Sequence, residues 1–176
     1  MKILLIGPQG SGKSTQAKML GEFLNIPVIS TGDIFRNLIQ ENSDIGRMLN
    51  GILTEGRLVD DQTTCKIVKE RLSQPDYRQG FIADGYPRTV EQVQIFDPKF
   101  DKVFHLDVPE EEVIKRLLAR AREDDTEELI KTRLDLYNRQ TEPLLDYYQN
   151  MGILTEIDGI GSVEDIQQRI RDSLKK

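Results

Sequence analysis

The stretch Lys2-Ile-Leu-Leu-Ile-Gly-Pro-Gln-Gly-Ser-Gly-Lys-Ser14 decides how this chain folds, because it joins a short apolar run directly to a glycine-rich turn. Residues 2–6 predict a strand buried on both faces, as in a parallel sheet. Residues 7–14 match the pattern G-x-x-x-x-G-K-[ST] and lie between a predicted strand and a predicted helix, the context that this pattern requires. Backbone N–H groups in such a loop turn inward around a phosphate at the start of a helix. The stretch therefore predicts a phosphate-binding loop.

This loop supplies candidate contacts to a nucleoside triphosphate. We expect Lys13 to reach the outer phosphates and Ser14 to ligate Mg²⁺, with Thr15 as a further candidate ligand. The expected triphosphate contacts are Gly10, Ser11, Gly12, Lys13, Ser14 and Thr15. The alternative, a glycine-rich turn with a coincidental lysine, is disfavoured because both the pattern and its context are satisfied. A dinucleotide fingerprint, G-x-G-x-x-G, does not occur.

Short apolar segments alternate with helical segments along the rest of the chain. Further strands are predicted at residues 25–29, 80–83, 103–106 and 152–157. Helices are predicted at residues 13–24, 31–50 with a break near Ser43, 60–73, 89–96, from Pro109, 126–151 and from Ser162. Strand–helix alternation is typical of a parallel sheet covered on both faces. We therefore predict one α/β domain over residues 1–176, with a P-loop NTPase-type five-stranded parallel sheet and helices on both of its faces.

Composition limits the classes of function. The net charge of −6 argues against general nucleic-acid binding, for which a basic face is expected. Apolar runs stay well below the roughly 20 residues of a membrane span, and the N-terminal run is too short for a signal peptide. One cysteine, Cys65, and one histidine, His105, exclude a disulfide framework and a multi-histidine metal site. We expect a monomeric cytoplasmic protein with neither nucleic acid nor membrane as a partner.

A second polar site is predicted at the same edge of the sheet. Ser30-Thr31-Gly-Asp33-Ile-Phe-Arg36 follows the second predicted strand, and Asp84-Gly85-Tyr-Pro-Arg88-Thr-Val-Glu-Gln92 follows the third. Open parallel sheets bind ligands at the carboxyl ends of their strands. Each segment brings one arginine to that edge, and arginine suits bidentate contact with phosphate. Asp84 ends an apolar strand, a context typical of an acid that orients Mg²⁺ and its waters.

Taken singly, these side chains also have structural interpretations. Arg36 would be a surface charge of its helix, and Asp33 a helix cap. Arg88 would be a turn-capping cation, and Gln92 an exposed helix residue. As a set that accompanies the phosphate loop, they favour a ligand site.

Several motifs recur in a familiar order. They are GPQGSGKSTQ at residues 7–16, ISTGDIFR at 29–36, GRLVDD at 56–61, GFIADGYPRTVEQ at 80–92 and RLDLYNRQTEPLLDYY at 133–148. With Ile157-Asp-Gly159 they span nearly the whole chain, and in this order the chain resembles the adenylate kinases. The resemblance implies a nucleoside monophosphate kinase that catalyses ATP + AMP ⇌ 2 ADP with Mg²⁺ as cofactor. It also implies a helical lobe for the nucleoside monophosphate (NMP) at residues 30–59.

The resemblance assigns roles to matching positions. It implies AMP contacts at Thr31, Arg36, Leu58, Val59, Gly85, Arg88 and Gln92. It implies cations on the transferred phosphoryl group at Lys13, Arg36, Arg88, Arg122 and Arg133. It implies ATP contacts at Arg120, against the adenine, and at Gly159, and Mg²⁺ contacts at Ser14 and, through water, at Asp84 and Asp33. Related uridylate and cytidylate kinases tend to carry Ala and Asn where this chain has Thr31 and Gln92, which favours AMP as the acceptor.

The chain departs from the family at the lid. Residues 120–125 form a vestigial lid turn, in which only Ala121 separates Arg120 from Arg122. Side chains two residues apart on a helix point about 200° apart, so we expect the helix to end near Arg120 and Arg122 to lie in the turn. Asp124 and Asp125 would orient these arginines, and Arg116 is expected to be structural or exposed. So short a lid should exclude water poorly and leave more ATP hydrolysis.

Two alternative functions remain open at this stage. One is a kinase for another monophosphate, such as CMP, UMP or dAMP. It gains some weight because Ser14 stands where adenylate kinases commonly have Gly. The other is a nucleotide-binding regulator or weak NTPase that has lost phosphoryl transfer together with its lid. The intact set of Thr31, Arg36, Arg88 and Gln92 argues against this second alternative.

Overall fold

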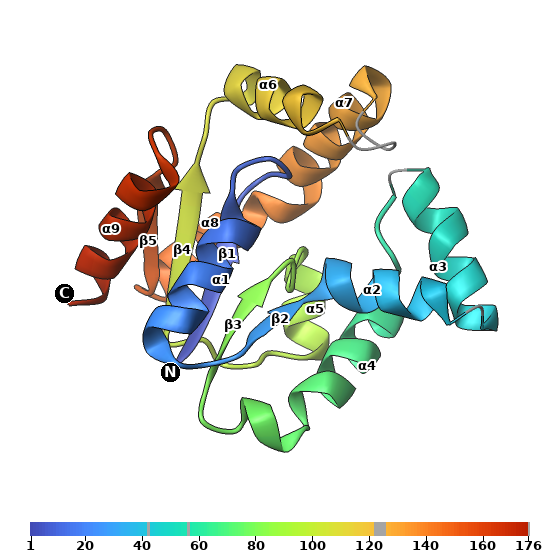
Figure 1. Ribbon diagram of the computed structural model, residues 1–176. Coiled ribbons are helices and arrows are strands. Elements are labelled where there is room, and N and C mark those ends of the chain that lie inside the picture. Colours follow the sequence, from blue (N-terminus) through green and yellow to red (C-terminus); the bar gives the residue numbers. More distant parts are fainter. Residues whose placement is uncertain (42, 56, 122–125, 176) are drawn as a thin grey trace.

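The computed structural model describes residues 1–41, 43–55, 57–121 and 126–175. Its centre is a five-stranded sheet with the order β2-β3-β1-β4-β5 (Figure 1). The strands are β1 (Lys2–Ile6), β2 (Val28–Ser30), β3 (Phe81–Asp84), β4 (Lys102–Asp107) and β5 (Leu154–Asp158). Every neighbouring pair is parallel, which confirms the predicted five-stranded parallel sheet.

The register brings the ends of the central strands into one row. Leu5 of β1 is paired with Asp84 of β3 on one side and with Phe104 of β4 on the other. Ser30 of β2 is also paired with Asp84. The chain leaves β1 toward β2 on one side and later crosses to β4 on the other, so the carboxyl end of β1 lies at a topological switch point. Ligands of open α/β sheets bind at such points.

Helices cover both faces of the sheet. On one face, Ile3 and Leu5 of β1 pack in a core with α1 (Lys13–Leu24) and α9 (Val163–Leu174). On the other face, Leu4 and Ile6 pack in a core with α4 (Asp61–Leu72), α5 (Val90–Ile95) and α8 (Pro143–Asn150). Alternate residues of one apolar strand therefore serve two cores, as expected for a strand buried on both sides.

Two helical pairs extend beyond the sheet (Figure 1). The first consists of α2 (Thr31–Gln40) and α3 (Asp44–Thr54), which share a small core of Phe35, Leu49 and Val59. The second consists of α6 (Glu110–Arg120) and α7 (Glu127–Leu136), which share a core of Val113, Leu117, Ile130 and Leu134 with Val108. Each pair has its own apolar contacts, so each packs as a unit on the edge of the sheet.

Side-chain caps set several helix starts where the sequence predicts them. The hydroxyl groups of Ser43, Thr126 and Ser162 accept hydrogen bonds from the main chain at the starts of α3, α7 and α9. Such a bond satisfies one of the free N–H groups at a helix start. The predicted break near Ser43 is thereby confirmed.

Two predicted elements differ from the structure. The second strand begins at Val28 rather than Asn25, because Asn25 closes α1 in a left-handed conformation with φ of 52°. The predicted helix over 126–151 is interrupted by a π-helical turn, η2 (Tyr137–Thr141), before α8 begins. Pro143 explains the interruption, since proline has no N–H to continue the helical ladder. A short 3₁₀ turn, η1 (Pro75–Tyr77), precedes β3.

Cys65 and His105, to which the sequence analysis gives no catalytic role, lie in a helix that packs on the sheet and in a strand of the sheet. Cys65 of α4 is buried and unpaired, and His105 of β4 is buried, with a pKa that burial lowers. In the described ranges, the helices are too short or too polar to cross a membrane.

The core predicts unequal effects for two phenylalanines. Phe104 of β4 is 0% exposed, whereas Phe23 of α1 is 53% exposed and stacks on the Arg171 guanidinium at 4.2 Å. We expect Phe104→Ala to lower the free energy of unfolding by about 3–5 kcal/mol, through a cavity in the core. The control Phe23→Ala should lower it by about 1 kcal/mol or less. Urea denaturation measures both, and similar losses would contradict this packing.

Candidate active site

The phosphate loop connects β1 to α1 in the conformation that its glycines allow. Gly10 and Gly12 have φ of 89° and 92°, in the left-handed region that favours glycine. A Cβ at Gly10 would lie 2.8 Å from Cγ of Leu117, so α6 packs directly on the loop. Within the loop, the Lys13 ammonium donates to the carbonyl oxygen of Pro8 at 3.1 Å. The Ser11 hydroxyl is buried without a hydrogen-bond partner in the described structure.

Positive charge gathers at the end of this loop. Burial lowers the pKa of Lys13, the Asp84 carboxylate opposes this, and Arg88 and Arg120 lower the pKa further. Burial also lowers the pKa of Arg88, with Asp84 again opposing and Arg133 adding to the decrease. Because these groups act on each other's charge, the structure brings together Lys13, Arg88, Arg120 and Arg133. Lys13 and Arg88 beside one carboxylate, with Arg120 near Lys13 and Arg133 near Arg88, favour a polyanionic ligand.

Asp84, whose charge acts on both Lys13 and Arg88, is the last residue of β3 and is 5% exposed. It accepts a hydrogen bond from the Ser14 hydroxyl at 2.5 Å. A hydroxyl and a carboxylate are the hard oxygen donors that Mg²⁺ prefers, and Mg²⁺ commonly takes only one or two protein ligands beside water and phosphate oxygens. Ser14 and Asp84 therefore fit the predicted metal.

Asp33, the third predicted metal contact, is otherwise engaged. Its carboxylate pairs with the Arg36 guanidinium at 2.5 Å, and both side chains are more than half exposed. This hydrogen bond holds the pKa of Asp33 below its usual range. Arg36 is therefore held on its own helix, by an acid one turn earlier.

The predicted acceptor residues form a hydrogen-bonded network. The carbonyl oxygen of Gly85 accepts from the Thr31 hydroxyl at 2.9 Å and from Arg88 Nε at 3.0 Å. The main-chain N–H of Arg88 donates to Oε1 of Gln92 at 2.7 Å. The structure thus brings together Thr31, Gly85, Arg88 and Gln92, which come from the segments after β2 and β3.

Gln92 does not have the exposed surface position that its structural interpretation predicts. It is 1% exposed, and its Nε2 donates to Oδ1 of Asp61 at 2.9 Å. Asp61 also accepts from the Thr89 hydroxyl at 3.1 Å. Sequence analysis missed Asp61 and Thr89, whose only signals are their places beside the helix cap Asp60 and within the DGYPRT motif.

The remaining acceptor residues lie in the α2–α3 pair and the segment that follows it. Val59 is buried against Phe35 and Leu49, and Leu58 is partly buried. Their main chain leads from α3 into α4. This segment therefore connects the helical pair to the Asp61 network.

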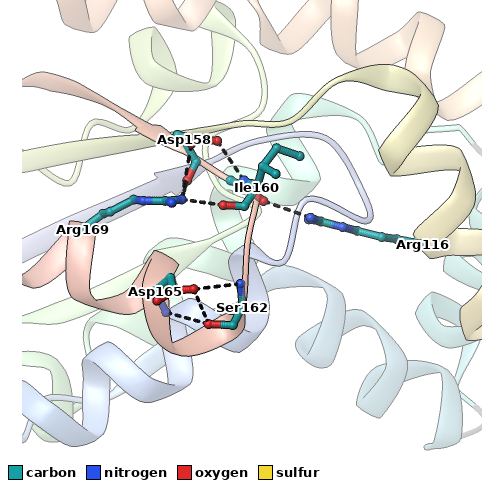
Figure 2. A network of polar contacts seen from close by, with 7 residues as sticks. Arg116, Asp158, Ile160, Ser162, Asp165 and Arg169 are labelled. Atoms are coloured by element: carbon teal, nitrogen blue, oxygen red, sulfur yellow. Dashed lines mark hydrogen bonds and ion pairs between the residues drawn. The ribbon is translucent and has the colours of Figure 1, made fainter.

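Two arginines hold the loop after β5, which contains Gly159 (Figure 2). Arg116 of α6 donates to the carbonyl oxygen of Gly159 at 3.0 Å and of Ser11 at 3.5 Å, and to Glu112 at 2.8 Å. From the other side, Arg169 of α9 donates to the carbonyl oxygens of Asp158 at 2.7 Å and Ile160 at 2.6 Å. Arg116 therefore bridges the phosphate loop and Gly159, a role that its sequence did not indicate.

Only the first two residues of the lid segment 120–125, Arg120 and Ala121, are described. Helix α6 ends at Arg120, as expected, and Ala121 closes it in a left-handed conformation with φ of 50°. Arg122, Asp124 and Asp125 lie outside the described residues. Arg133 lies on α7, partly buried, on the far side of the turn.

Because of its backbone conformation and its neighbours, we expect that no residue with a side chain replaces Gly85 without a loss of stability. Its φ is 84°, and a Cβ there would lie 2.6 Å from the Thr31 hydroxyl. We expect Gly85→Ala to lower the free energy of unfolding by about 2 kcal/mol, through the left-handed backbone and the contact, and to weaken AMP binding. The control Gly51→Ala has open space in α3 and should be neutral or stabilising by up to about 1 kcal/mol. Urea denaturation measures the stability of the two variants, and calorimetric titration measures their affinity for AMP. Unchanged AMP binding in Gly85→Ala would contradict the placement of Gly85 in the AMP site.

Comparison with known proteins agrees with this geometry. A family model described as adenylate kinase matches residues 5–153. Adenylate kinases of Corynebacterium urealyticum and Mycobacteroides abscessus are both 43% identical, with 100% and 99% of each chain covered, respectively. That of Streptomyces avermitilis is 38% identical, over 100% of this chain and 98% of its own. Its alignment extends over 215 positions against the 176 residues here, and a short lid is consistent with the shorter chain. The chain belongs to the adenylate kinase family of nucleoside monophosphate kinases.

Proposed function

We propose that this protein is an adenylate kinase that transfers the γ-phosphoryl group of ATP reversibly to AMP and gives two ADP. The observation that carries the proposal is that Asp84 joins two sites: it accepts from Ser14 of the phosphate loop at 2.5 Å, and its charge acts on Lys13 of that loop and on Arg88. Arg88 in turn belongs to the network of Thr31, Gly85 and Gln92. A donor site and an acceptor site thus share one positive centre.

The proposed reaction is an in-line displacement. An oxygen of the AMP phosphate forms a bond to the γ-phosphorus of ATP, and the bond from that phosphorus to the bridging oxygen breaks and leaves ADP. The AMP phosphate is already ionised at neutral pH, so no protein base is needed. The contribution of the protein is orientation and stabilisation of charge by Lys13, Arg36, Arg88, Arg122 and Arg133. Arg36 would exchange Asp33 for the AMP phosphate.

The cofactor of this reaction is Mg²⁺, which would neutralise charge on the phosphate oxygens of ATP. Ser14 would hold it directly and Asp84 through water, since these two groups lie within hydrogen-bond distance of each other. Asp33 would contribute only after release of Arg36.

The contacts of α6 support different roles for Arg116 and Arg120 in binding ATP. Arg116 touches Gly159 and Ser11, so we assign it to the adenine side of the ATP site together with Gly159. Arg120 influences the charge of Lys13, which supports a position near the phosphates as well as the proposed adenine contact. Gly10, Ser11, Gly12 and Thr15 would complete the binding of the triphosphate.

The remaining assignments follow from the family and the composition. The NMP-binding lobe would comprise residues 30–59, with Leu58 and Val59 in the AMP pocket, and the lid residues 120–125. We propose a monomeric cytoplasmic enzyme whose partners are ATP, AMP and ADP, with no nucleic acid or membrane among them.

The decisive experiment is an assay of ADP formation from ATP and Mg²⁺, with and without AMP, and in parallel with CMP, UMP, dAMP and GMP. We expect two ADP for each ATP consumed, with AMP as the preferred acceptor. Faster transfer to another monophosphate would change the substrate. ATP loss that is indifferent to every acceptor would overturn the proposal in favour of an NTPase or a nucleotide-binding regulator.

Two substitutions test the cationic centre. We expect Lys13→Met and Arg88→Lys each to reduce kcat by about 10²–10³-fold, because each removes a donor to charge that develops in the transition state. The control Lys175→Met removes an exposed lysine paired with Asp172 at the end of α9 and should leave kcat unchanged. Steady-state kinetics give kcat for each variant, and circular dichroism shows whether each is folded. A kcat equal to that of the wild type in folded Lys13→Met would contradict the mechanism.

A further inference from the structure

A chain of partly buried hydrogen bonds runs from Asp61 to the main chain of Arg88. Oδ1 of Asp61 accepts from Nε2 of Gln92 at 2.9 Å, and Oε1 of Gln92 accepts from the N–H of Arg88 at 2.7 Å. The Thr89 hydroxyl closes the network, since it donates to the same Asp61 oxygen and accepts from the N–H of Gln92, both at 3.1 Å. Gln92 is 1% exposed and Thr89 6%, so water hardly competes for these bonds.

These bonds fix the orientation of the Gln92 amide. The main-chain N–H of Arg88 can only donate, so it requires the amide oxygen. An ionised Asp61 carboxylate can only accept, so it requires the amide nitrogen. Two independent demands thus select the same one of the two amide orientations. If the amide were reversed, its NH₂ group would face the N–H of Arg88 and its oxygen would face the carboxylate of Asp61. Both unfavourable contacts would lie in a partly buried position.

The fixed amide retains a defined pattern for a ligand. An amide offers two N–H donors and two acceptor positions on its oxygen. One N–H is used by Asp61 and one acceptor position by Arg88, which leaves one donor and one acceptor side by side. Adenine matches such a pair through its N1 acceptor and its 6-amino donor, by the same donor–acceptor complementarity with which glutamine contacts this base in DNA. A base with the reversed pattern would need the reversed amide.

Asp61 is well placed to hold this orientation. It is the first residue of α4, directly after the segment that leads from α3, and α4 packs against α5, which carries Gln92. The neighbouring Asp60 has a different task, since its carboxylate caps α4 by accepting from the N–H of Thr63 at 2.9 Å. The two adjacent acids therefore separate capping of the helix from orientation of the amide.

We propose that Asp61 is a positioning residue for acceptor selection, which fixes the Gln92 amide so that the site accepts adenine and rejects a purine with the opposite hydrogen-bond pattern. The inference rests on the proposed function, in which Gln92 faces the base of the acceptor. Asp61 acts through Gln92 and does not itself touch the substrate. Inosine monophosphate is the matched probe, because it carries N1–H and a 6-oxo group where AMP has an N1 acceptor and a 6-amino group.

The test compares three variants with the wild-type protein. Calorimetric titration gives the Kd for AMP and for inosine monophosphate, and the transfer assay gives kcat and KM with each. We expect Asp61→Ala to reduce the preference for AMP over inosine monophosphate at least tenfold, with the KM for ATP little changed. Asp61→Asn keeps an acceptor oxygen for Gln92 and Thr89 and should retain the preference to within about threefold. Asp60→Ala loses the cap of α4 and should lower the melting temperature while it leaves the preference unchanged.

The outcomes separate this inference from the proposed function. Wild-type preference for AMP that survives in Asp61→Ala, or that falls equally in Asp60→Ala, overturns the role of Asp61 while adenylate kinase activity stands. Equal binding of both monophosphates by the wild type also overturns it. If the wild type binds AMP selectively but forms no ADP from it, the proposed activity fails, and the binding preferences of the variants still decide the role of Asp61. Should Asp61→Ala prove unfolded in its melting curve, Asp61→Ser takes its place, because the serine side chain is one bond shorter and no longer accepts from the Gln92 amide. A loss of preference in folded Asp61→Ser supports the inference, and retention overturns it.

Discussion

The attraction between the Asp84 carboxylate and the cations around it is the interaction on which the site depends. Lys13 and Arg88 both lie where burial disfavours their charge, and for both of them Asp84 opposes that effect. A buried charge without a partner is strongly destabilising, so a centre of several cations needs such an anion while no phosphate is bound. Asp84 also accepts from Ser14, which links the charge balance to the phosphate loop.

The parallel sheet explains why this carboxylate lies where it does. Asp84 is the last residue of β3, in register with Leu5 of β1 and Ser30 of β2. In the proposed function, the loop after β1 would therefore bind the triphosphate, and the segments after β2 and β3 would bind the acceptor. Three segments far apart in sequence reach one edge, because each follows a parallel strand that ends there. The fold thus provides two adjacent phosphate positions with one charge centre between them.

Local patterns predicted the sheet and most helices, and they predicted polar segments at one edge of the sheet. The glycine-lysine loop, the capping residues Ser43, Thr126 and Ser162, and the polar segments after β2 and β3 each carry a signal within a few residues. The residues that were missed act over longer distances. Asp61 meets Gln92 across 31 positions, and Arg116 meets Gly159 across 43. Such contacts depend on how helices pack on the sheet, and no local pattern marks them. The π-helical turn before Pro143 was missed for a different reason: the helical pattern continues on both sides of it, although Pro143 is itself a local signal of an interruption.

The packing of Leu117 against Gly10 has a consequence for the energetics of the two sites. The same leucine belongs to the α6–α7 core, so the root of the lid and the phosphate loop share a side chain. Displacement of the root of α6 would open a gap beside the loop, and the contact therefore keeps the loop in its binding shape before any nucleotide arrives. On the acceptor side, Arg36 lies on Asp33 and must change partners. In the proposed mechanism the triphosphate would thus meet a loop already held in shape, whereas AMP would compete with Asp33 for Arg36, and this competition would lower its apparent affinity by the fraction of Arg36 that is paired.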